Sequence, residues 1–145
     1  MSRSSDRGTE AGQALVEFAL VVPLLLLLVV GVIEFGRAWN VSQAVNYAAR
    51  QGARTAAVLN GQLPPSQIED SVVAVVTDAL GSNNVACNGC VEQPIPGAGV
   101  GQVVTVTVSV PYQFIVLGPI MELASLILDA DDTFTLRSTS VMRNE

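Results

Sequence analysis

The pattern of hydrophobic and polar residues divides this chain into a polar start, a long apolar run and a remainder in which apolar and polar residues alternate at short intervals. Residues 1–12 are polar, and a nearly unbroken apolar run follows from Gln13 to Ile33. Sixteen residues without a charge lie between Glu17 and Glu34, and as a helix they would span about 24 Å. A helix that begins at Gln13 would span about 31 Å, close to the bilayer core of about 30 Å. The pattern therefore predicts a membrane-inserting helix near the N-terminus.

The helical pattern continues beyond the apolar run. Residues 34–59 contain no proline and are rich in alanine, and Trp39 lies where a membrane–water interface is expected. Pro23, inside the apolar run, removes one backbone hydrogen bond and is expected to kink or loosen the helix. Glu34 and Arg37 are expected to form an exposed pair one turn apart, worth roughly a few tenths of a kcal/mol. We therefore expect one helix to leave the membrane and continue as a stalk.

Small residues recur at every fourth position of this stalk. They are Ala44, Ala48, Gly52 and Ala56. Such a strip allows close approach of another backbone, so we expect it to be a helix-packing surface. Two alternatives remain equally open, in which the strip covers the protein's own domain or packs against the helices of other subunits.

A second, shorter helix is predicted after the stalk. Residues 60–65 break the first helix, and Ser66 with Glu69 has the spacing of a capping box. Gly81 is a suitable residue to follow the end of this helix. One apolar face is expected to consist of Ile68, Val72, Val73, Val76, Ala79 and Leu80.

The C-terminal part of the chain predicts strands. Residues 103–110 alternate Val with Thr or Ser, which predicts a strand, and residues 133–142 are expected to form the closing strand. Pro111 marks an edge, a bulge or the end of the first strand. Residues 112–130 are apolar and ambiguous between strand and short helix. Residues 60–145 are therefore expected to form a small α+β domain, with one helix packed on an antiparallel sheet.

Composition narrows the possible functions. Charged residues make up 14% of the chain, against about 25% in an average soluble domain. The seven basic residues are all Arg, and the chain has neither Lys nor His. The usual Ser-His-Asp and Cys-His machinery, imidazole metal sites and Schiff-base lysines are therefore excluded. We predict no enzyme, no metal and no cofactor, and the net charge of −6 gives no indication of a nucleic-acid partner.

The two cysteines, Cys87 and Cys90, flank an Asn-Gly dipeptide in a stretch rich in Gly and Pro. Asn-Gly suits a tight turn that would bring the two sulfurs together. The favoured interpretation is a small structural disulfide in an oxidising compartment. Free thiols and a thioredoxin-like redox pair remain alternatives, although a redox pair normally has a helix that begins at its first cysteine.

The junction between the polar start and the apolar run carries a recognisable pattern. Gly12 ends the polar segment, Gln13 begins the apolar one, and Glu17 is the fifth residue after the glycine. A polar leader, a glycine, a glutamate at this spacing and a hydrophobic helix together resemble the processing site of type IV prepilins. The resemblance implies cleavage between Gly12 and Gln13, after which Glu17 meets the new amino terminus of a neighbouring subunit. The chemistry agrees, because glycine presents no side chain to a peptidase cleft and a carboxylate in an apolar helix needs a partner.

A wider stretch resembles the TadE-like family of tight-adherence (Flp) pilus assembly proteins. The similarity is close over residues 12–57 and looser over residues 138–145. Its most specific segments are ALVEFALVVPLLLL, IEFGRA and AARQGAR. The resemblance implies a minor pilin-like structural subunit, a pseudopilin, that a prepilin peptidase matures.

The resemblance also implies an organisation and a set of partners. Residues 1–12 would be a cytoplasmic leader peptide, residues 13–59 a transmembrane and stalk helix, and residues 60–145 an extracytoplasmic domain. The protein would cross the bacterial cytoplasmic membrane once, and it would enter a surface pilus or prime its assembly. Expected partners are other pilin or pseudopilin subunits, the prepilin peptidase, the inner-membrane pilus assembly platform and membrane lipid.

Two other functions fit parts of the sequence. A secreted protein with an ordinary signal peptide would use the small residues Gly36 and Ala38 before a cleavage at Trp39. A membrane-anchored thiol oxidoreductase would use Cys87 and Cys90. The N-terminal residue of the mature protein would distinguish the secreted protein from a pilin-like subunit. An assay of insulin reduction would distinguish the thiol oxidoreductase from it.

Overall fold

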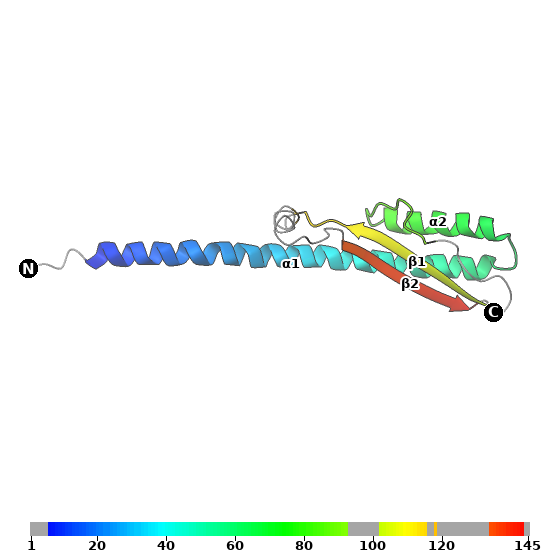
Figure 1. Cartoon of the computed structure of the whole chain (residues 1–145), viewed down its shortest axis with the longest axis horizontal. Helices are drawn as coiled ribbons and strands as arrows, with labels where there is room; N and C mark the ends of the chain where they lie inside the picture. Colours follow the sequence, from blue (N-terminus) through cyan, green and yellow to red (C-terminus); the bar gives the residue numbers. More distant parts are fainter. Residues whose placement is uncertain (1–5, 93–101, 116–117, 119–133, 144–145) are drawn as a thin grey trace, which may run out of the picture.

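The computed structural model describes residues 6–92, 102–115, 118 and 134–143, with the side chains of the first helix described from Gly12 onward. A single long helix carries a small domain at its C-terminal end (Figure 1). The elements are α1 (Asp6–Leu59), α2 (Pro65–Gly81), β1 (Val103–Tyr112) and β2 (Phe134–Arg143). The predicted α+β class is confirmed.

The first helix, α1, is longer than the sequence pattern indicated. It begins at Asp6, inside the predicted leader, and runs without interruption through Pro23 to Leu59. Once a helix is nucleated, each further residue adds one hydrogen bond at little cost, so the polar start can join it. The apolar run, the stalk and part of the leader therefore form one continuous element.

The second helix, α2, begins at a pair of prolines. The predicted capping box at Ser66 and Glu69 is wrong, because Pro64 occupies the N-cap position without a side-chain hydrogen bond and Pro65 lies in the first turn. Proline suits this turn, since its φ matches the helix and the first N–H groups have no helical acceptor. Gly81, expected just after the helix, is its last residue.

The core forms where α2 and the sheet both pack against the C-terminal half of α1. Gly52 shows how close this packing is. A Cβ atom at Gly52 would lie 2.9 Å from Val76 Cγ2 of α2 and 3.2 Å from Val106 Cγ1 of β1. Glycine at this position therefore lets side chains from both elements meet the backbone of α1. The apolar face of α2 is buried there through Ile68, Val72, Val76, Ala79 and Leu80.

The sheet described by the structure consists of β1 and β2, paired antiparallel from Val103 opposite Arg143 to Tyr112 opposite Phe134. The two predicted strands are therefore confirmed. Alternate residues of β1 are buried, namely Val104, Val106, Val108, Val110 and Tyr112. Within the described residues α1 packs on both strands, so the stalk supplies the helix that covers the sheet. The expectations for residues 116–117 and 119–133 lie outside the described part of the chain.

Candidate functional site

The N-terminal part of α1 is apolar and uncovered. Over the described residues, α1 is the one helix long and apolar enough to cross a membrane, and none of its most apolar stretch is buried. Leu15, Leu20 and Leu24 are each about two-thirds exposed. Contact of such apolar side chains with water is unfavourable by about 25 cal/mol per Å² of apolar surface. This helix therefore suits insertion into a membrane or burial among other helices.

The residues of the predicted processing site all lie on this uncovered part of α1. Gly12, Gln13 and Glu17 are exposed. A Cβ atom at Gly12 would meet no heavy atom within 4 Å. No hydrogen bond or ion pair joins Glu17 to another described residue. Gln13 and Glu17 are four residues apart and so share one face of the helix. The junction and the carboxylate are thus both open to a second molecule.

The strip of small residues on the stalk lies in the core of the chain's own domain. Ala44, Ala48 and Ala56 are at most 5% exposed, and Gly52 is buried. The side chains of Val72, Val76 and Val106 surround Gly52. Of the two alternatives for this strip, the structure has the one in which it covers the protein's own domain.

Glu34, at the C-terminal end of the apolar run, is a buried carboxylate with three neighbours that donate hydrogen bonds. Its side chain is 2% exposed. Arg37 Nη1 lies 3.1 Å from Oε2, Tyr112 Oη donates to the same oxygen over 3.3 Å, and the Ile115 N–H donates to Oε1 over 3.0 Å. We call these four residues the Glu34 junction. It ties the end of β1 to α1 at the end of the apolar run.

The Glu34 junction corrects an expectation. The sequence predicted an exposed pair between Glu34 and Arg37, and the pair exists, but Glu34 is buried while the Arg37 side chain is 41% exposed. The physical reason is that the end of β1, with Tyr112, folds over this turn of α1. Spacing within one helix contains no information about a strand almost eighty residues later. The signals that were present are a charge at the end of an apolar run and a tyrosine at the end of a strand.

Burial also affects the acid–base behaviour of Tyr112. Its pKa lies above the ordinary value because burial disfavours the charged phenolate; Arg37 opposes this, and the charge and hydrogen bond of Glu34 add to it. The folded state therefore holds this proton more firmly than the unfolded state. Stability from this group is fully present below a pH of about 10 and falls as the pH rises through the folded-state pKa.

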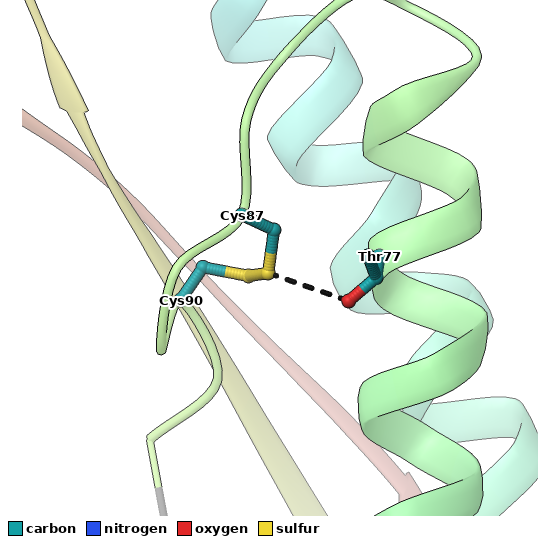
Figure 2. The surroundings of a disulfide bond; sticks show 3 residues. All are labelled: Thr77, Cys87 and Cys90. Carbon is teal, nitrogen blue, oxygen red and sulfur yellow. Dashed lines mark hydrogen bonds between the residues drawn. A yellow bond between two sulfur atoms is a disulfide. The ribbon is translucent and has the colours of Figure 1, made fainter.

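Cys87 and Cys90 form a disulfide with Cα atoms 5.2 Å apart. The Thr77 hydroxyl of α2 lies 3.6 Å from Cys87 Sγ, as Figure 2 shows. On the other side, the Ser109 N–H of β1 donates to the Cys90 carbonyl oxygen over 2.7 Å. The disulfide closes a loop of residues 87–90, which we call the disulfide loop, and these contacts hold it between α2 and β1. No helix begins at Cys87 in the structure, so the arrangement lacks the helix that a thioredoxin-like pair normally has.

An open groove lies beside the Glu34 junction. Its volume is about 340 Å³. The described residues that line it come from α1 (Arg37 and Val41), from residues 84–86 after α2, from Asn88 between the two cysteines, and from residues 110–113 at the end of β1. Arg37 is the charged residue among these.

The comparison with known families concerns the first part of α1. The model of a family described as TadE-like protein matches residues 12–54. This segment is TadE-like. The predicted resemblance is therefore confirmed over the apolar run and most of the stalk. No curated protein and no solved structure matches the chain.

The TadE-like segment contains some of the candidate residues and not others. It begins at Gly12 and includes Glu17, Glu34 and Arg37, but Tyr112 and the disulfide loop lie outside it. TadE-like proteins are associated with Tad pili. Over residues 12–54 the chain therefore resembles a family of pilus-associated proteins, and this segment contains the apolar part of α1 that is long enough to cross a membrane.

Proposed function

We propose that this chain is a pilin-like structural subunit, matured by a prepilin peptidase, that takes part in assembling a tight-adherence pilus. The observation that carries the proposal is a TadE-like helix whose N-terminal part is apolar and uncovered while its C-terminal part is the centre of a folded domain. Such a helix joins a domain to a membrane, or to a bundle of similar helices, without a flexible linker.

The helix suits this role mechanically. The strip Ala44, Ala48, Gly52 and Ala56 is buried in the domain, and no break separates it from the apolar run. A displacement of the apolar part along its axis would therefore move the domain with it. This property suits a subunit that is extracted from a membrane into a fibre.

The second part of the proposal is that Glu17 promotes the association of subunits. Glu17 is exposed on the apolar helix. An ionised carboxylate inside a bilayer costs about 2.5 kcal/mol or more when it has no partner. After cleavage, the amino group of Gln13 in a neighbouring subunit would provide a positive partner. The free energy recovered by this pairing would favour association of subunits.

The disulfide supports an extracytoplasmic domain. Disulfides persist in oxidising compartments, such as the bacterial periplasm or cell surface. We propose that the polar N-terminus begins in the cytoplasm and that the domain built on α2 and the sheet lies outside. The membrane, the other pilin subunits, the peptidase and the assembly platform are the partners in this proposal.

Processing is tested by the mass and N-terminal sequence of the membrane-extracted protein. We expect residues 1–12 to be absent and Gln13 to be the first residue. Gly12→Val places a β-branched side chain at the scissile bond and is expected to abolish cleavage. Gly8→Val, the same change four residues upstream, is the matched control and should leave cleavage intact. A mature chain that begins at Trp39, or a Gly12→Val protein that is still shortened by twelve residues, would contradict the proposal.

A further inference from the structure

The groove beside the Glu34 junction has a chemical character that the proposed assembly role does not use. Its lining includes Arg37 of α1 and three residues with amide side chains, namely Asn84, Asn88 and Gln113. The remaining lining includes the apolar side chains of Val41 and Val110. A cation with amide donors beside an apolar wall matches a phosphate ester attached to a hydrocarbon. No acidic residue belongs to the described lining.

Arg37 has donors left for such a ligand. A guanidinium carries five N–H donors, and the ion pair with Glu34 is made through Nη1. The Arg37 side chain is 41% exposed, so it is reachable from solvent. The Glu34 carboxylate is shared with Tyr112 and Ile115, and it holds the arginine at the groove.

The position of the groove along α1 indicates that the phosphate belongs to a membrane lipid. Arg37 lies four residues beyond Ile33, the last residue of the apolar run, which is a rise of about 6 Å along a helix. The polar headgroup layer extends about 5–7 Å beyond each side of the hydrocarbon core. On the same turns Phe35 and Trp39 are exposed and stacked, with ring centroids 6.3 Å apart. Exposed aromatic residues of this kind favour the membrane–water interface.

We propose that this groove binds the headgroup of an anionic phospholipid from the leaflet that the domain faces. Arg37 pairs with the phosphate, the amides of Asn84, Asn88 and Gln113 bind its remaining oxygens and the headgroup hydroxyls, and Val41 contacts the glycerol end. The bound lipid orients the domain on the membrane before the subunit leaves it. This inference rests on the membrane insertion in the proposed function and is independent of cleavage at Gly12.

The test uses the full chain reconstituted in nanodiscs that contain equal amounts of phosphatidylglycerol and phosphatidylcholine. Native mass spectrometry after release into detergent measures which lipid stays bound. We expect wild type and Arg37→Lys to retain phosphatidylglycerol in preference to phosphatidylcholine. Arg37→Gln is expected to lower this preference by about fivefold, which is the effect of one basic residue near a membrane surface.

A second variant separates lipid binding from folding, because Arg37→Gln also removes a partner of the buried Glu34. Asn88→Asp adds a negative charge to the groove and leaves the Glu34 junction intact, so it is expected to lower the preference by a similar factor. Gln43→Glu is the matched control. It adds the same charge to an exposed position of α1 that lies six residues beyond Arg37 and outside the described lining, and it should retain the wild-type preference.

Three results would overturn the proposal. They are equal retention of the two lipids by wild type, an equal loss in Gln43→Glu and Asn88→Asp, and displacement of phosphatidylglycerol by inorganic phosphate, which would make a soluble anion the ligand. Flotation of the wild-type chain with phosphatidylcholine vesicles measures insertion alone. A chain that floats without lipid preference contradicts only the groove, whereas a chain that does not float contradicts the membrane role itself.

Discussion

Glu17 and Glu34 lie at opposite ends of the apolar segment of α1, in different surroundings. Glu34 is 2% exposed and accepts hydrogen bonds from Tyr112 and Ile115. Glu17 is exposed, and no described residue bonds to it. Since a carboxylate in an apolar setting requires a partner, Glu34 is satisfied within the fold, whereas Glu17 in a membrane would depend on another molecule. The comparison therefore assigns Glu34 to the domain and is consistent with the assembly role proposed for Glu17.

The largest expected effect is on the stability of the domain. Glu34→Ala removes the acceptor for Arg37, Tyr112 and the Ile115 N–H, and it is expected to lower the free energy of unfolding by about 3 kcal/mol. Glu17→Ala, the matched change at the exposed glutamate, should stay within about 0.5 kcal/mol of wild type. Chemical denaturation in detergent, followed by near-ultraviolet circular dichroism, measures both. Equal effects of the two changes would contradict the claim that Glu34, and not Glu17, stabilises the domain.

The next largest effect on stability is expected from a comparison of two glycines of α1, one in its packed part and one at an open position. Gly52→Ala puts a Cβ atom 2.9 Å from Val76 Cγ2, and the resulting overpacking is expected to cost about 1–3 kcal/mol. Gly36→Ala, at a position with no heavy atom within 4 Å of the added Cβ, should be neutral or stabilise the helix by up to about 1 kcal/mol. The same denaturation assay applies. A Gly52→Ala protein as stable as wild type would contradict the close packing described for the stalk.

The smallest stability effect is expected at the disulfide. A closed loop of four residues removes little entropy from the unfolded chain, so replacing both Cys87 and Cys90 by Ser should cost at most about 2 kcal/mol. The variant should remain folded, and the wild type should not reduce insulin. Collapse of the domain in the variant, or insulin reduction by the wild type, would show that the pair has a larger structural role or a redox one.

The sequence predicted those features that depend on local pattern. Three such patterns each lie within a short stretch of sequence. They are the apolar run of residues 13–33, the alternation of Val in β1 and the change from polar to apolar residues at Gly12. They led to the long helix, the strands and the TadE-like resemblance. The burial of Ala44, Ala48, Gly52 and Ala56 was left between two alternatives, because a strip of small residues has the same pattern whichever surface covers it.

Features that depend on contacts between distant segments were missed. The burial of Glu34 requires Tyr112, and the groove requires the disulfide loop beside Arg37. No spacing along one element encodes these contacts. The capping box failed for a local reason, since Pro64 and Pro65 allow the helix to begin one residue earlier than Ser66. Prolines before a predicted cap are a signal that sequence analysis can weigh.

The most direct test of the difference between the glutamates is recovery of pilus components with tagged Glu17→Ala protein from membranes. We predict normal membrane insertion and normal removal of residues 1–12, with at least about tenfold less pilin recovered than with wild type. Val16→Ala, the neighbouring change on the same exposed helix, should recover the wild-type amount. If Glu17→Ala recovers as much pilin as Val16→Ala, the exposed carboxylate has no role in assembly, and the apolar helix is a membrane anchor alone.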